Sequence, residues 1–237
     1  MAVFYQIKSP LSQITEERMR RYIDSLSDAL GEKLEKVSLE QHLADDFALL
    51  YVASGGSEGY FLEVFDQLKS RHCCILTSGD STSLAASMEI LSFLKKHGGS
   101  GEILHGDIEQ VAGRIRALKN AHRAKALLKG KKLGCIGKPS DWLISSDADK
   151  EKVKSLLGIE LIDIPMQELL DEITDSEKIY DALKVLIDRY QLQGFTLRCF
   201  DLLSTVKNTG CMPLARLNAE GYVAGCEGDV PAMLSMM

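Results

Sequence analysis

The chain has 237 residues, of which 45% are hydrophobic and 26% charged, a composition typical of a globular protein with one or two domains. Its 28 Lys and Arg and 34 Asp and Glu give a formal net charge of −6, which disfavours a nucleic-acid partner. Apolar runs such as residues 47–53 are far shorter than the roughly 18 residues of a membrane span, and the N-terminus lacks a signal pattern. We therefore expect a cytoplasmic protein with no nucleic-acid or membrane partner.

The six cysteines are too few for a disulfide scaffold, and none of their spacings forms a C-x-x-C motif. Cys73, Cys74, Cys135 and Cys199 each lie in a short apolar run that is typical of a strand. We expect most of the cysteines to be reduced thiols packed in apolar surroundings.

Short apolar or β-branched runs at regular spacing predict the strands of the protein. From the third run onward their starts recur about every 30 residues, which is the span of one βα unit. The predicted strands are residues 3–7, 36–39, 47–52, 73–77, 102–105, 132–136, 160–164, 195–200 and 222–226.

The segments between these runs carry apolar residues at helical spacing, for example Met19, Ile23 and Leu26 near the start of the chain. Helices that alternate with continuously apolar strands favour parallel sheets covered by helices on both faces. The sequence therefore predicts a doubly wound α/β protein.

Five predicted strands and a long helix over residues 108–129 precede a lysine-rich hinge. We predict a flavodoxin-like domain over residues 1–130 and a second Rossmann-like domain over residues 131–237. Asp229 as N-cap and Pro231 in the first turn predict a final helix, and the chain stops about two turns later. We expect the second domain to be incomplete at its C-terminal end.

Polar loops follow two strands of the first domain. Residues 54–57, Ser-Gly-Gly-Ser, lack a known phosphate-binding spacing, so a simple turn is favoured over an anion site. In residues 77–83, the side chains of Asp80, Ser81 and Ser83 could bind a sugar or cap the following helix, and both interpretations stay open. The basic stretch over residues 114–132 is better explained as a solvated or subunit-contact face than as an anion site.

Two carboxylates flank a glycine directly after the last predicted strand, in Cys226-Glu227-Gly228-Asp229. Asp229 alone would suffice to cap the next helix, so Glu227 has no capping duty. Carboxylates at the carboxyl end of a strand can hold a divalent cation or move a proton. The spacing by itself leaves the structural and the functional interpretation open.

Several segments carry a resemblance to a known family, namely residues 194–203, 208–211, 217–221 and 226–232, with a looser match over residues 81–94. Together they resemble the L-fucose isomerase-like family of sugar isomerases. The resemblance implies a metal-dependent aldose–ketose isomerase that forms a homo-oligomer, with two N-terminal α/β domains ahead of a C-terminal domain. In that family the glutamate corresponding to Glu227 binds Mn²⁺ and takes part in proton transfer.

The sequence departs from this family in its metal ligands. A second acidic ligand and a histidine ligand are expected beyond Met237, and none of the five histidines lies in a matching segment. With Glu227 and Asp229 as its predicted ligands, the metal site of this chain is expected to be incomplete and to bind Mn²⁺ weakly. The first hypothesis is the N-terminal part of a sugar isomerase, and the alternative is a non-catalytic sugar-binding or assembly module of the same fold.

Overall fold

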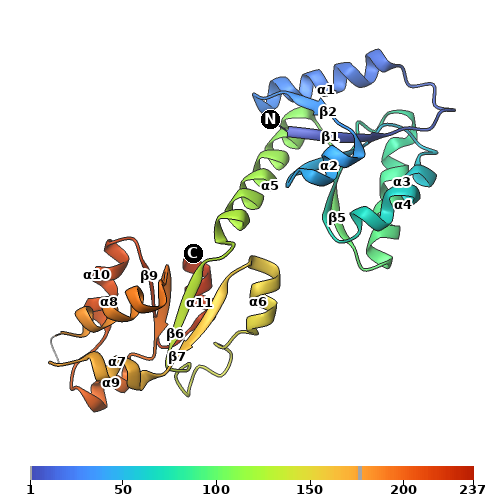
Figure 1. Cartoon of the computed structure of the whole chain (residues 1–237). Coiled ribbons are helices and arrows are strands. Elements are labelled where there is room, and N and C mark those ends of the chain that lie inside the picture. The colour runs from blue at the N-terminus through green and yellow to red at the C-terminus, as the bar shows by residue number, and fades with distance from the viewer. Residues whose placement is uncertain (1, 176–177) are drawn as a thin grey trace. The chain divides into compact units, whose positions relative to one another are not determined.

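The computed structural model describes residues 2–175 and 178–237, which form two compact units divided between Arg123 and Ala124 (Figure 1). Each unit contains one parallel sheet with helices between its strands, so the predicted pair of doubly wound α/β domains is confirmed. The boundary between the units falls within α5 (Ile108–Leu128), the long helix expected from the sequence.

The first sheet has the strand order β2-β1-β3-β4-β5, which is the flavodoxin-like order. Side chains of β3 alternate between two cores: Leu49 and Tyr51 pack with α1 and α5, whereas Leu50 and Val52 pack with α3 and α4. The elements are β1 (Ala2–Ile7), α1 (Glu16–Leu30), β2 (Leu34–Lys36), α2 (Leu39–Ala44), β3 (Ala48–Val52), α3 (Glu58–Leu68), β4 (His72–Leu76), η1 (Asp80–Thr82), α4 (Ser83–Lys96) and β5 (Ser100–Leu104).

The second sheet repeats the pattern with the order β7-β6-β8-β9, all parallel. Phe195 on β8 packs into the core that α8 and α10 cover, and Leu133 on β6 packs into the core that α6 and α11 cover. The elements are β6 (Lys132–Ile136), α6 (Lys150–Leu157), β7 (Glu160–Ile164), α7 (Met166–Glu172), α8 (Ile179–Tyr190), β8 (Gly194–Leu197), α9 (Phe200–Thr205), α10 (Cys211–Ala219), β9 (Val223–Cys226) and α11 (Val230–Met236).

The strand order identifies the switch point of each sheet. In the second sheet the chain passes from β6 to β7 on one side and from β8 to β9 on the other, so the loops after β6 and β8 leave the sheet in opposite directions. In doubly wound sheets ligands bind at this switch point. In the second unit it brings together the segments that follow β6 and β8, with the segment after β9 beside them.

Two predicted strands differ from the structure because local hydrogen bonds start a helix there. The strand predicted over residues 195–200 ends at Leu197, so Cys199 lies in a turn and Phe200 begins α9. The strand predicted over residues 36–39 lies slightly earlier, as β2, because Ser38 and Gln41 form a capping box that begins α2.

The start of α11 matches the prediction. The Asp229 side chain caps this helix by accepting a hydrogen bond from the Ala232 N–H at 2.8 Å, and Pro231 lies in its first turn. In the part of the chain that the structure describes, no helix combines the length and the apolar character needed to cross a bilayer.

Candidate functional site

Three loops meet at the carboxyl edge of the second sheet, after β6, β8 and β9. The indole Nε1–H of Trp142, in the loop after β6, donates a hydrogen bond of 2.8 Å to Oε2 of Glu227, which follows β9. The backbone N–H of Ser140 donates to the Glu227 carbonyl at 2.9 Å. Both the side chain and the main chain of Glu227 are therefore held by the loop after β6, about 85 residues earlier in the chain.

Glu227 sits in an unusual backbone turn. Its φ is +61° and that of Gly228 is +73°, so two successive residues adopt the left-handed conformation, which costs roughly 1–2 kcal/mol for a residue with a Cβ. A Cβ on Gly228 would lie 2.5 Å from the Lys138 carbonyl oxygen and 2.8 Å from Pro139 Cα, so this turn needs glycine there. Backbone strain of this kind at a sheet edge is a recurrent feature of functional sites.

The two predicted carboxylates have different surroundings. Asp229 uses Oδ1 to cap α11, as the sequence predicts. Glu227 is partly exposed, and its Oε1 has no hydrogen-bond donor among the described residues. Glu227 thus offers one carboxylate oxygen that is oriented and available, and the metal-binding and proton-transfer roles of both residues stay predictions.

Arg198, directly after β8, anchors the loop that carries Trp142. Its guanidinium contacts both carboxylate oxygens of Asp141 at 3.0 and 3.1 Å, Asp201 at 3.0 Å and the Pro139 carbonyl at 2.8 Å. These charge-assisted hydrogen bonds raise the pKa of Arg198 and lower that of Asp141. Because its charge is matched by two carboxylates, Arg198 serves to position the loop rather than to bind an anion.

Trp142, Asp141 and Arg198 are absent from the candidates that the sequence singled out. A usable signal was present, since Trp142 is the only tryptophan of the chain and lies in a polar loop after an apolar strand. Trp142 and Phe200 are both exposed and make a T-shaped ring contact, with centroids 5.1 Å apart.

Two cysteines lie next to the turn at Glu227 and Gly228, with Cys199 Sγ 3.0 Å from Cys226 Sγ. Partial burial and the Cys199 thiol raise the pKa of Cys226 to about 12, so it is a neutral thiol at pH 7. Of the four cysteines expected in apolar surroundings, all are buried, whereas Cys211 and Cys226 are exposed. Within residues 2–175 and 178–237, no group of three or more His, Cys, Asp or Glu side chains is arranged to hold a metal ion.

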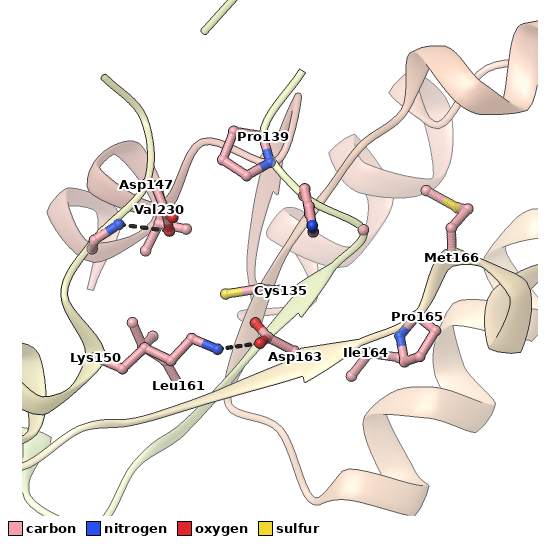
Figure 2. A pocket seen from close by; sticks show the side chains of 13 residues that line it. Cys135, Pro139, Asp147, Lys150, Leu161, Asp163, Ile164, Pro165, Met166 and Val230 are labelled. Atoms are coloured by element: carbon pink, nitrogen blue, oxygen red, sulfur yellow. Dashed lines mark hydrogen bonds and ion pairs between the residues drawn. The ribbon is translucent and has the colours of Figure 1, made fainter. Parts of the chain in front are cut away.

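A pocket of about 550 Å³ lies on the other side of the loop after β6, toward β7. Figure 2 shows Lys150 and Asp163 pointing toward one another across it, where they form an ion pair, with Cys135 of β6 nearby. Burial raises the pKa of the Cys135 thiol to about 11. Two lysines, Lys138 and Lys150, and two aspartates, Asp147 and Asp163, line this pocket, so its formal charges balance. Glu227 is not among its lining residues, and we therefore place the candidate site at the Glu227 edge.

The predicted sugar-binding residues of the first unit lie together at the carboxyl edge of its sheet. Asp80 is half-buried and pairs with Arg18 at 2.7 Å, and Ser81 is exposed with a φ of +48°. Ser83 is fully buried, and its Oγ accepts a hydrogen bond from Thr77 Oγ1 at 2.7 Å. Their contact with a sugar stays a prediction.

The helix-capping alternative for this loop is not seen. Thr82 occupies the N-cap position of α4 without a side-chain capping bond, and its hydroxyl donates to the Ser81 carbonyl at 2.7 Å instead. In the neighbouring Ser-Gly-Gly-Ser loop, Ser54 Oγ accepts from the Ser9 N–H at 3.0 Å and Ser57 Oγ donates to the Ser54 carbonyl at 2.7 Å. The Ser57 hydroxyl therefore bonds within the turn, whereas the Ser54 hydroxyl joins the turn to the segment after β1.

The basic stretch on α5 also has partners within the first unit. Arg114 makes two hydrogen bonds to Glu102, at 2.8 and 2.9 Å, and Arg116 donates to the Ala29 carbonyl at 2.7 Å. These pairs occupy two of the basic side chains, and the interpretation of the stretch as a solvated or subunit-contact face stays a prediction.

Comparison with known proteins relates this chain to enzymes that act on sugars. No protein-family profile matches it. Two sulfoquinovose isomerases, from Priestia aryabhattai and from Priestia megaterium (strain ATCC 12872 / QMB1551), are each 25% identical to it over 193 aligned residues. This is a distant similarity to a sugar isomerase. The alignment covers 68% of this chain and 42% of each relative, so the match spans less than half the length of those proteins.

Proposed function

We propose that the chain is the N-terminal two-domain part of a metal-dependent aldose–ketose isomerase, in which Glu227 transfers the proton. The observation that carries the proposal is the Glu227 carboxylate at the carboxyl edge of the sheet, with Oε2 held by Trp142 and Oε1 left available. The distant similarity to two sulfoquinovose isomerases supports the reaction class.

The geometry suits a proton transfer between adjacent sugar carbons. Conversion of an aldose to a ketose moves one hydrogen from C2 to C1 and one hydroxyl hydrogen from O2 to O1, through an enediol, with no net change in composition. A base near C2 can remove the first hydrogen and return it to C1. Glu227 Oε1 is suited to this task because the Trp142 N–H holds the other carboxylate oxygen in place and leaves Oε1 without a donor among the described residues.

A divalent cation such as Mn²⁺ would stabilise the negative charge that develops on the enediolate oxygens. Glu227 could supply one or two of the roughly six oxygen ligands that such an ion prefers. Asp229 has one oxygen engaged in capping α11, and the described residues form no cluster of three ligands. The residues present do not make a complete cation site, so we expect the 237-residue chain alone to bind Mn²⁺ weakly and to turn over no sugar.

The proposed substrate is a small sugar in the aldose form. The relatives make sulfoquinovose one candidate, beside L-fucose and L-arabinose, which the sequence resemblance implies. We further propose a homo-oligomer in which Asp80, Ser81 and Ser83 of one subunit contact the sugar bound to its neighbour.

The test compares Glu227→Gln with Glu160→Gln in the protein encoded by the complete reading frame, with added Mn²⁺. Glu160 is an exposed carboxylate at the amino end of β7, at the opposite edge of the same sheet, and is therefore a matched control. Ketose formation and solvent deuterium incorporation at C1 would be followed by NMR. We expect the Glu227 variant to lose isomerisation by about 10²-fold or more and the control to keep it. Full activity of Glu227→Gln would refute the assignment.

A non-catalytic sugar-binding or assembly module is the second candidate. The absence of a three-ligand cluster within residues 2–175 and 178–237 favours it. It predicts that the complete protein binds a sugar with no ketose formed and no deuterium exchanged, whether or not Mn²⁺ is present.

A further inference from the structure

We propose that Trp142 and Phe200 form an aromatic platform on which the sugar ring stacks, next to Glu227. This inference deepens the proposed function, because it takes a sugar as the ligand of the same edge. It concerns how the ligand is held and does not depend on whether the ligand is then converted.

The platform lies where a doubly wound sheet binds its ligand. Trp142 follows β6 and Phe200 follows β8, and these adjacent strands flank the switch point of the second sheet. The two rings meet in a T-shaped contact, with centroids 5.1 Å apart and planes at 88°. The contact covers at most one face of one ring, so aromatic surface remains exposed beside the switch point.

The two rings are exposed in a way that is costly unless something covers them. Trp142 is 58% exposed and Phe200 is 45% exposed, although a tryptophan and a phenylalanine are among the residues that gain most from burial. Single exposed apolar residues are common on protein surfaces, but here two aromatic rings touch each other beside a carboxylate.

The platform is held rigidly before any ligand arrives. Arg198 binds Pro139 and Asp141 on one side of the loop, and the Leu143 N–H donates to the Ser140 carbonyl at 2.8 Å, which closes the turn that carries Trp142. The indole N–H is fixed on Glu227. Because the Trp142 side chain is already held in place, it loses little conformational freedom when a ligand binds, and this preorganisation favours affinity.

Aromatic and polar groups near the platform match the apolar face of a sugar ring and the hydroxyl groups at its edge. The C–H groups on one face of a pyranose ring are apolar and pack on an aromatic face, while hydroxyl groups at the ring edge need hydrogen-bond partners. Glu227 Oε1 is one such acceptor. Ser140, in the same loop, has a buried hydroxyl with no partner in the described part of the chain, which leaves a second polar group unsatisfied near the platform.

The experiment uses intrinsic fluorescence, because Trp142 is the only tryptophan of the chain. The 237-residue chain, whose tryptophan emission comes from Trp142 alone, and the complete protein would each be titrated with sulfoquinovose, L-fucose and L-arabinose, and with mannitol as an acyclic polyol of similar hydroxyl content. We expect at least one of the sugars to change the emission of Trp142 saturably and mannitol to leave it unchanged. Calorimetry on the same samples gives the Kd independently of fluorescence.

Variants then identify the stacking contribution. Trp142→Ala and Phe200→Ala are each expected to weaken the Kd of the sugar by about 3- to 10-fold, and Trp142→Phe, which keeps a ring, by less. Ile144→Ala is the matched control, since Ile144 is 94% exposed in the same loop, and its Kd should stay unchanged. Circular dichroism would verify that each variant is folded.

The outcomes separate this inference from the proposed function. Sugar binding that is unchanged in both alanine variants overturns the platform, even if the protein isomerises the sugar. Sugar binding that is weakened in both variants, without ketose formation by the wild type, supports the platform and refutes the proposed isomerase. No binding of any sugar in the panel overturns the platform, and a protein segment would then be the better candidate to cover these rings.

Discussion

Gly228→Ala tests whether the close approach of two loops creates the candidate site. Gly228 has a φ of +73°, and an added Cβ would meet the Lys138 carbonyl oxygen at 2.5 Å and Pro139 Cα at 2.8 Å. Both contacts are with backbone atoms, so the substitution cannot be relieved by rotating a side chain. The loop that carries Trp142 must move away from Glu227.

The expected magnitude has two parts. A left-handed alanine costs roughly 1–2 kcal/mol relative to glycine. Forcing a methyl group into a filled space adds about 1–3 kcal/mol. Gly130→Ala isolates the first part, because Gly130 has a φ of +80° and nothing within 4 Å of an added Cβ. We expect Gly228→Ala to lower the free energy of unfolding by about 2–5 kcal/mol and Gly130→Ala by about 1–2 kcal/mol.

Urea unfolding followed by Trp142 fluorescence provides the assay, since this residue reports on the second unit alone. Gly228→Ala should also shift the native emission of Trp142, because the indole N–H loses its bond to Glu227, whereas Gly130→Ala should leave the native spectrum unchanged. Equal unfolding free energies for the two variants, within about 0.5 kcal/mol, together with identical native spectra, would refute this reasoning.

Two further predictions concern the first unit. Burial, and to a smaller extent the charge of Arg71, lowers the pKa of His42 to about 4. The stability that neutral His42 contributes is therefore present above pH 6.5 and is lost as the pH falls toward 4. His42→Gln should remove this loss of up to about 3 kcal/mol, measured by circular dichroism in urea at each pH. A wild type whose stability is flat over this range would contradict it. In the complete protein, Asp80→Ala should raise the sugar KM by about tenfold, and Arg18→Gln, which breaks the same ion pair but keeps the carboxylate, by much less. Equal effects of the two substitutions would indicate a structural role for Asp80.

Local signals in the sequence were sufficient for most of the secondary structure and for the fold class. Apolar runs and helical stripes depend on residues close in the chain, so the strand pattern and the two parallel sheets could be predicted without long-range information. The cap at Asp229 and Pro231 is local for the same reason. The helix start at Phe200 was missed because the apolar run through Cys199 continues past the end of β8.

Only part of the candidate site could be predicted from local sequence signals. Glu227 could be singled out because it follows a strand and has no capping duty, but its partner Trp142 lies about 85 residues away in the chain. What brings them together is the order β7-β6-β8-β9, which sequence periodicity does not specify, together with the Arg198 contacts and the left-handed turn at Gly228. Periodicity is set by which face of each element is buried, whereas the site depends on which strands are neighbours, and only the tertiary structure decides that.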